Sequence, residues 1–244
     1  MIKTNVKKII ETLFCFMAIF CLFMFSACSD PKSSNDDSDN NNDNTYNNNY
    51  EIYTVIGTAT PKQGCDVDFE TALSETVEKI ENILNNYVDD ASVTILDGNK
   101  IKIEFSGDKN NFIKVQTEML TPANIEFRLE ENGEARITGK HVSEAYAFNS
   151  QGNWGVVIRF SEQGQQLFHQ LTQDALNQTE HKIYIYSNGQ EISEPTVESP
   201  INTGSTFISG SYDFDSADAF ALQIMAGTFN INIAWGEITT TNNN

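Results

Sequence analysis

The sequence predicts an α+β fold, and three features of its 244 residues support that prediction. Segments rich in β-branched and aromatic residues are typical of strands. They are interspersed with segments in which apolar residues recur every three or four positions, as on one face of a helix. No pattern repeats at intervals of about 20 to 50 residues, so a solenoid or propeller is not expected. The length suits one large domain or two small ones.

The first half of the predicted globular part has the order β-α-β-β-α-β. Asp68 is placed to cap the first helix, and Asp97-Gly98-Asn99 is a strong hairpin signal. Pro122 ends the second helix, because proline disfavours a helical conformation in the residue before it. We expect strands over 51–60, 92–96, 101–105 and 125–129, and helices over 69–87 and 110–120. This order is the split βαβ arrangement, so residues 51–130 are predicted to form a ferredoxin-like base.

The second half is predicted to form another α+β subdomain over 131–236. Asn188-Gly189 indicates a tight turn. Asp213 or Asp215 can cap the last helix, and Gly227 can close it. The expected elements are a short helix over 140–146, a strand over 155–160, a helix over 162–177, a strand over 181–186, a helix ending at 225 and a strand over 229–235.

The N-terminal segment has the layout of a secretory signal. Three lysines precede an apolar run over 13–25, which ends in Phe25-Ser26-Ala27-Cys28. Cysteine directly after two small residues resembles a bacterial lipoprotein signal, in which that cysteine becomes the mature N-terminus and carries lipid such as palmitate. Residues 1–27 are therefore predicted to be a signal peptide, and Cys28 is the predicted lipidation site that holds the protein to membrane lipid.

Two alternatives remain open for this segment. Phe25 stands where lipoprotein signals usually have Leu or another aliphatic residue. The run could instead be an uncleaved membrane anchor, but a span needs about 20 apolar residues and this run has about 13. It could also direct ordinary secretion. In all three cases the body of the protein is exported, and as a lipoprotein it is expected in the bacterial cell envelope, with the body extracytoplasmic.

Polar segments flank the predicted globular part. Residues 29–50, in the predicted tether over 28–50, are mostly Ser, Asp and Asn and contain almost no apolar side chains apart from Tyr46 and Tyr50. Such a segment cannot bury enough apolar surface to offset the entropy of ordering it, so we expect a disordered tether with a reach of about 25 Å. Residues 237–244 are predicted to be a short disordered tail.

Charge and cysteine content exclude some functions. The predicted signal carries three Lys and one Glu, so its removal takes the formal net charge from −19 to −21. Such an acidic protein is a poor match for phosphate, and we expect no nucleic-acid partner. Cys15 and Cys21 would leave with the signal. Once Cys28 is lipidated only Cys65 remains, so no intramolecular disulfide is expected, and Cys65 is interpreted as a small surface or half-buried residue.

No group of residues indicates catalysis, a metal or a cofactor. The residues considered are His141, His169 and His181 for a metal, Asp213, Asp215 and Asp218 for calcium, and Ser205, Ser209 and Ser211 for a nucleophile. The histidines lack ligand spacing, the aspartates lack the glycine and terminal glutamate of a calcium loop, and the serines lie in no nucleophile elbow. Trp154 and Trp235 suit either a core or an interface. We therefore expect the protein not to be an enzyme.

Several segments resemble, in order, the large extracytoplasmic domain of SecD, the accessory subunit of the Sec protein-export channel. They are Thr121-Pro122-Ala123-Asn124-Ile125-Glu126-Phe127-Arg128, Ile137-Thr138-Gly139-Lys140, Val157-Ile158-Arg159-Phe160 to Gly164, Ile183-Tyr184-Ile185 with Asn188-Gly189, Ile192-Ser193-Glu194-Pro195, Ile208-Ser209-Gly210 and Ala219 to Gly227. The resemblance covers about residues 66 to 233. It implies a ferredoxin-like base with a head subdomain, and contacts with exported polypeptides or Sec translocon components.

This chain departs from SecD in ways that affect the expected function. SecD has six membrane helices whose charged residues support proton-driven motion, whereas no apolar stretch after residue 28 could span a bilayer here. Phe229-Asn230 stands where the family usually has Leu-Pro. We therefore expect a tethered, non-enzymatic binding module for exported or unfolded polypeptide rather than a motor. The alternative is an envelope surface-interaction lipoprotein that uses the same fold for another partner.

Overall fold

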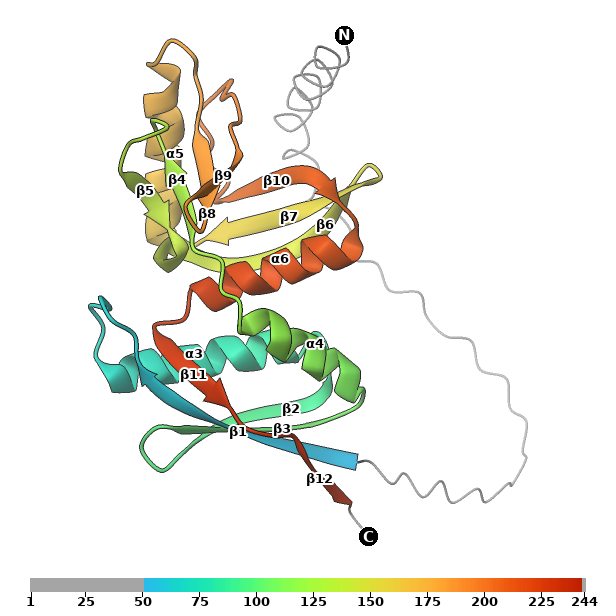
Figure 1. Ribbon diagram of the computed structural model, residues 1–244. Coiled ribbons are helices and arrows are strands. Elements are labelled where there is room, and N and C mark those ends of the chain that lie inside the picture. Colours follow the sequence, from blue (N-terminus) through green and yellow to red (C-terminus); the bar gives the residue numbers. More distant parts are fainter. Residues whose placement is uncertain (1–50, 243–244) are drawn as a thin grey trace, which may run out of the picture. The chain divides into compact units, whose positions relative to one another are not determined.

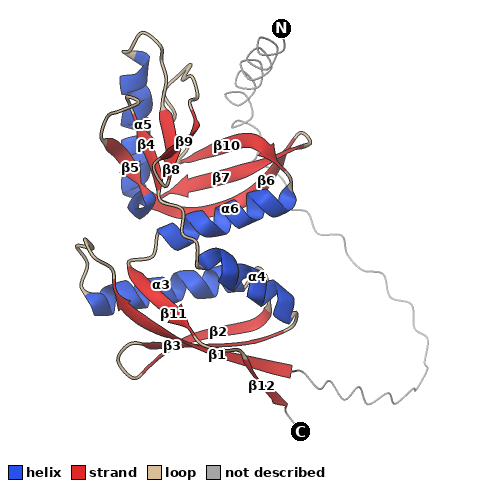
Figure 2. Ribbon diagram, viewed as in Figure 1, coloured by secondary structure: helices blue, strands red, loops and turns tan. Residues whose placement is uncertain are grey.

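The computed structural model describes residues 51–242, which fold into four α-helices, one short 3-10 helix and twelve strands (Figures 1 and 2). The predicted signal peptide, Cys28 and the predicted tether up to residue 50 lie outside the described residues. The α+β class is confirmed. The sheet that contains β1, together with α3 and α4, is called the base, and the elements from β4 to α6 are called the head.

The base elements lie at both ends of the described chain. They are β1 (Glu51–Pro61), α3 (Phe69–Leu84), β2 (Asp89–Leu96), β3 (Lys100–Ser106), α4 (Lys109–Met119), β11 (Ile231–Trp235) and β12 (Thr239–Asn242). The strands are antiparallel in the order β11-β1-β3-β2, and β12 also pairs with β1. Figure 1 shows α3 and α4 on one face of this sheet. The ring of Phe112 on α4 stacks on Phe105 of β3 with 4.2 Å between centroids, which fixes that helix to the sheet.

Several local predictions for the base are confirmed. The Asp68 carboxylate accepts a hydrogen bond from the Thr71 backbone N–H at 3.0 Å, as an N-cap residue should. β2 and β3 form the predicted hairpin about Asp97-Gly98-Asn99, with Gly98 at a positive φ of 66°. These features depend on neighbouring residues, so they can be predicted from short stretches of sequence.

The prediction that the strand over 125–129 belongs to the base is wrong. That strand forms as β4 (Ile125–Arg128), but it pairs with β5 and β8, and β11 takes the fourth place in the base sheet. After α4 the backbone N–H of Ala123 donates to the carbonyl of Gln223 on α6 at 2.8 Å, which leads the chain away from the base. Phe127 then packs edge-on against Phe160 and Phe168, with centroids 5.5 and 6.0 Å away. The head is thus inserted between α4 and β11.

The head contains two sheets and two helices. Its elements are β4, β5 (Ala135–Thr138), the 3-10 helix η1 (Gly139–His141), β6 (Val142–Ser150), β7 (Asn153–Phe160), α5 (Glu162–Leu176), β8 (Tyr184–Ser187), β9 (Gln190–Ser193), β10 (Ser205–Tyr212) and α6 (Phe214–Gly227). One sheet has the order β5-β4-β8-β9 and the other β10-β7-β6, all antiparallel. The predicted Asn188-Gly189 turn joins β8 to β9, with φ of 51° and 78°.

The predicted helix over 140–146 is wrong, because most of that segment is strand β6. Only Gly139–His141 is helical, as a single 3-10 turn. A two-residue turn of Gln151 and Gly152, with φ of 52° and 92°, folds β6 onto β7. Ala145 and Ala147 pack against the core while the alternate residues Tyr146 and Phe148 do not, which is the two-residue alternation of a strand.

The predicted disorder over 237–244 is also contradicted for four residues. Thr239–Asn242 form β12, whose backbone pairs with the first residues of β1, from Glu51 opposite Asn242 to Thr54 opposite Thr239. Both ends of the described chain therefore meet at one strand. β1 is paired along one side with β3 and along the other with β11 and then β12.

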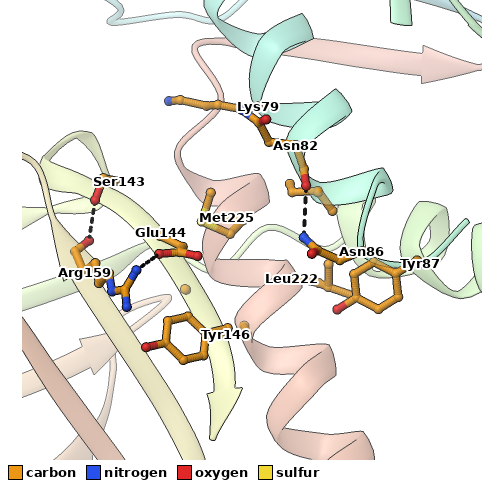
Figure 3. Close-up of a pocket in the computed structure, with 13 residues that line it drawn as sticks. Lys79, Asn82, Asn86, Tyr87, Ser143, Glu144, Tyr146, Arg159, Leu222 and Met225 are labelled. Atoms are coloured by element: carbon orange, nitrogen blue, oxygen red, sulfur yellow. Dashed lines mark hydrogen bonds and ion pairs between the residues drawn. The ribbon is translucent and has the colours of Figure 1, made fainter. Parts of the chain in front are cut away.

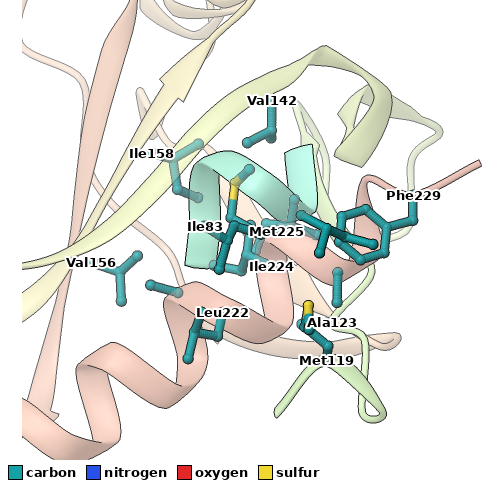
Figure 4. Packing of buried hydrophobic residues seen from close by; sticks show 14 of the residues in the cluster. Ile83, Met119, Ala123, Val142, Val156, Ile158, Leu222, Ile224, Met225 and Phe229 are labelled. Carbon is teal, nitrogen blue, oxygen red and sulfur yellow. The ribbon is translucent and has the colours of Figure 1, made fainter. Parts of the chain in front are cut away.

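Helix α6 joins the base and the head. Its N-terminus is capped by Asp213, rather than Asp215, through a 2.9 Å bond from the Ser216 backbone N–H. One side of α6 packs on β6 and β7 and another on α4. Figure 4 shows Ile83, Met119, Val156 and Ile158 gathered around Leu222, Ile224 and Met225 of this helix. The core is consequently continuous through α6.

The insertion of the head predicts how the chain responds to truncation. A chain that ends after Asn230 lacks β11 and exposes one edge of β1 with the buried residues behind it, so its base should lose cooperative unfolding in urea, followed by far-UV circular dichroism. A chain that ends after Gly236 keeps β11 and should retain that transition at a lower urea midpoint. Equal behaviour of both truncations and the full chain would mean that β11 does not complete the base.

Candidate functional site

A cleft of about 830 Å³ lies where α3, α6 and the β6–β7 pair approach one another. Figure 3 shows α3 and the two strands on opposite sides of this space, with α6 between them. Ala221, Leu222 and Met225 of α6 form an apolar floor, while Asn82 of α3 and Asn86 of the turn after it supply neutral polar groups. The cleft thus combines an apolar floor with polar walls, as binding sites commonly do.

The strand wall of the cleft is a free sheet edge. β6 pairs only with β7, and its residues 143 to 146 line the space. Alternate residues of an edge strand turn their backbone N–H and C=O away from the sheet. Among residues 51–242, no backbone group of residues 143 to 150 has a backbone partner outside the β6–β7 pair. The site therefore offers a row of main-chain donors and acceptors.

Two cationic side chains and one carboxylate border the cleft. Lys79 donates from Nζ to the carbonyl and hydroxyl oxygens of Thr228 at 3.2 and 3.3 Å, and burial lowers the pKa of its ammonium group. Arg159 pairs with Glu144 at 2.8 Å, and its guanidinium lies 5.2 Å from the ring centre of Tyr146. The formal charge of the lining is therefore +1, in a chain whose total is −19.

A polar cluster beside the cleft links the turn after α3 to α4 and α6. The Tyr87 hydroxyl donates to Oδ1 of Asp218 at 2.6 Å, and Lys114 Nζ lies 3.0 Å from Oδ2. The Asp218 side chain is only 8 % exposed, and among residues 51–242 its buried Oδ2 has no hydrogen-bond partner, so the charge of Lys114 is what compensates that oxygen. Burial raises the pKa of Tyr87, and the bond to Asp218 raises it further. The cluster holds the turn after α3, α4 and α6 together.

The residues considered for chemistry are spread over the structure. His141 is buried, its Nδ1 accepts from the Thr138 backbone N–H at 3.1 Å, and burial with nearby Lys140 lowers its pKa. His169 Nδ1 contacts the carbonyl of Ile201, and His181 lies in a loop at a φ of 53°. In the part of the chain that the structure describes, no three His, Cys, Asp or Glu side chains are grouped as a metal site.

The other residues named in the sequence analysis as possible site or interface residues have structural roles or no close partner. Asp213 caps α6 and Asp215 lies 3.4 Å from Lys114. Trp154 packs edge-on against Phe214 at 5.1 Å, and the Trp235 ring covers Gly57, where a Cβ would come within 2.7 Å of it. Cys65 is half-buried and free. The three serines considered as nucleophiles lie along β10, and they are Ser205, Ser209 and Ser211.

No helix between residues 51 and 242 is long and apolar enough to cross a bilayer.

The cleft itself was not visible in the sequence. A sheet edge binds through its backbone, and no residue type marks that capacity. The segment that forms this edge was moreover predicted to be helical. The alternation of Ala145, Tyr146, Ala147 and Phe148 was the available signal for a strand.

The Tyr87–Asp218 bond predicts a pH-dependent contribution to stability. The pKa of Tyr87 is raised from 10.0 in the folded protein, so the unfolded chain loses the phenol proton first and stability falls as pH rises above 10. At pH 8 Tyr87→Phe should lower the free energy of unfolding by about 1 to 2 kcal/mol, and the difference from the unmodified protein should shrink above pH 10. Urea denaturation at both pH values checks this, with Tyr146→Phe as the control, because the Tyr146 hydroxyl makes no side-chain hydrogen bond to any of residues 51–242. If the difference in free energy of unfolding between Tyr87→Phe and the unmodified protein stayed constant with pH, the raised pKa of Tyr87 would be contradicted.

Comparison with protein-family models finds a match over about the second half of the chain. Residues 115–231 match the family model described as "SecDF, P1 head subdomain". This range runs from α4 to the first residue of β11, and so contains the whole inserted head.

The relatives in sequence are SecD subunits. The protein translocase subunit SecD of Dictyoglomus turgidum is 25 % identical over 67 % of this chain and 40 % of its own length. That of Sebaldella termitidis is 24 % identical over 72 % of this chain and 45 % of its length, and that of a Synechocystis species is 31 % identical over 38 % and 21 %. The chain thus spans less than half of these relatives.

Solved structures agree on the fold. A SecDF crystal structure in a super-membrane-facing form superposes with a TM-score of 0.57 at 18 % identity, over 78 % of this chain and 30 % of that one. A structure from a study of SecDF as a membrane component that enhances protein export gives 0.54 at 18 % identity, over 74 % of this chain and 97 % of that one. The chain therefore contains a domain that is similar in sequence and fold to the head of SecD/SecDF proteins.

Proposed function

We propose that the protein is a membrane-anchored, non-enzymatic module that binds exported or unfolded polypeptide outside the cytoplasmic membrane. The free edge of β6, open to the cleft in a SecDF-type head, is the observation that carries this proposal. An extended chain can add to such an edge as a further strand, and its main-chain hydrogen bonds do not depend on its sequence. That property suits a protein that must contact many different exported chains.

The chemistry of the cleft supports binding rather than catalysis. Its charged groups are already paired, Arg159 with Glu144 and Lys79 with the oxygens of Thr228. Nucleophilic catalysis needs a nucleophile within hydrogen-bond reach of a base, and the cleft lining holds no histidine and no cysteine. The apolar floor and backbone edge instead favour reversible contact with an unfolded segment.

Anchoring would be supplied by Cys28. The basic start, the apolar run and the small residues before Cys28 support processing as a lipoprotein. A lipid at Cys28, followed by the polar segment 28–50, would keep the binding module close to the bilayer where exported chains emerge. Components of the Sec translocon are the proposed neighbours there, since the relatives in sequence are subunits of that machinery.

Site-specific crosslinking in cells tests the binding function. A photoreactive amino acid replaces Ala145 on the free edge, and the control replaces Thr58, which is exposed on a strand paired along both edges. Exported precursors should be captured from position 145 well above the yield from position 58. Capture of one folded envelope protein from position 145 would favour the alternative, a surface-interaction lipoprotein. Equal background yields from both positions would refute polypeptide binding at this edge.

Replacing the lipidation site tests the anchor. Cys28→Ala should release the protein from membranes or leave an unprocessed precursor, measured by fractionation and intact mass. Cys65→Ala is the matched control, because Cys65 is half-buried in the folded part and should not affect either readout. Unchanged mass and fractionation of the Cys28→Ala variant would refute lipidation.

A further inference from the structure

We propose that the β6 edge selects segments whose side chains are apolar at every second position, and binds them as an antiparallel strand. This inference rests on the proposed polypeptide binding and specifies its substrate class. The expected occupant is a short stretch of unfolded chain that would itself form an amphipathic β-strand. Which segments bind depends on which β6 residues direct their backbone N–H and C=O groups to the free edge, and on the surfaces that lie on the two faces of the sheet beside that edge.

The outward-facing residues of β6 follow from the register. The backbone N–H of Phe160 on β7 donates to Gly204, at the start of β10. Alternate residues of β7 therefore turn toward β10, and these include Ile158 and Val156. Their partners on β6 are Ala145 and Ala147. These two alanines must consequently direct their N–H and C=O groups away from β7, into the free edge.

The same alanines define the inner side of a bound strand. Ala145 and Ala147 pack against the hydrophobic core beside α6. In an antiparallel ladder, residues that lie opposite each other project their side chains to the same face. The bound residues that exchange hydrogen bonds with Ala145 and Ala147 would therefore place their side chains over the α6 floor of Leu222 and Met225. Apolar side chains are favoured there.

The other positions of a bound strand meet a different surface. Tyr146 and Phe148 stand on the face of the sheet away from α6, and neither packs against the core. The Phe148 ring meets Phe207 of β10 edge-on at 6.2 Å, and Arg159 pairs with Glu144 at one end. All of these groups are at least partly exposed to solvent. Polar side chains of the bound strand can remain hydrated on this side.

The two sides together specify a two-residue period. An apolar helix would satisfy its own backbone and leave the free edge of β6 unpaired. A strand that is charged at every inner position would bury those charges over the floor, with Lys79 repelling cations among them. Three alternate residues direct their N–H and C=O groups to the free edge, and they are Ala145, Ala147 and Asn149. A bound segment of about six residues, at about 3.4 Å per residue, would therefore fill this edge.

Peptide binding by the purified protein provides the test, read as fluorescence anisotropy. One labelled peptide alternates Val or Leu with Thr or Lys, and a second has the same composition in a shuffled order. The alternating peptide should bind at least about tenfold more tightly. Equal affinity of the two peptides would overturn the preference for apolar side chains at every second position, while leaving polypeptide binding intact. Absence of binding by either one would overturn the proposed function as well.

Backbone methylation of the peptide tests the register without altering the protein. N-methyl groups at the apolar positions remove the donors that face β6 and should abolish binding, whereas N-methyl groups at the polar positions should leave it within about threefold. Loss of binding from the polar positions instead, or from neither set, would overturn the antiparallel arrangement.

A protein variant gives an independent measurement. Ala145→Pro removes one outward N–H without removing a bond to β7, and Ala145→Ser keeps that N–H. The proline variant should bind the alternating peptide about tenfold more weakly and the serine variant about equally. Thermal unfolding of both variants shows whether the fold is retained, and the methylated peptides decide the question if the proline variant unfolds. Equal binding by two folded variants would overturn the use of this edge.

Discussion

Helix α6 must be buried on more than one side, and the arrangement of the other elements depends on that requirement. Its buried residues include Ala217, Ala221, Ile224 and Ala226, which do not lie on a single stripe. A helix that is apolar around most of its surface has to lie inside a core rather than on top of one. The β6–β7 pair covers one side and α4 another. The small alanines allow both layers to approach closely, and Asp213 fixes where the helix begins.

The buried cluster of Tyr87, Asp218 and Lys114 adds direction to that apolar contact. Hydrophobic burial alone is not directional, so it does not set the rotation of one helix against another. A carboxylate that is almost completely buried, with Tyr87 of the turn after α3 as one partner and Lys114 of α4 as the other, keeps both contacts in only a narrow range of helix positions. The polar cluster therefore defines how α6 lies on the base helices, and the cleft beside it takes its shape from that arrangement.

Local signals in the sequence predicted most elements, and non-local contacts account for the errors. The caps at Asp68 and Asp213 and the Asn188-Gly189 turn depend on a few adjacent residues. The partner of β4 instead depends on Phe160 and Phe168, more than 30 residues further along the chain. The free edge of β6 was equally hidden, since Ala145 and Ala147 carry no functional group and the segment was predicted to be helical. The SecD-like motifs identified the family but not this edge.

The position of β1 has a mechanical consequence if the proposed lipid at Cys28 holds the protein by its N-terminal segment. Any pull transmitted to Glu51 loads β1 along its length, parallel to its neighbours. β1 is hydrogen-bonded to β3 on one side and to β11 and β12 on the other, so the load is shared in shear by two ladders rather than breaking one bond at a time. The force would be carried by the base sheet, and the head, inserted between α4 and β11, would not lie in its direct path.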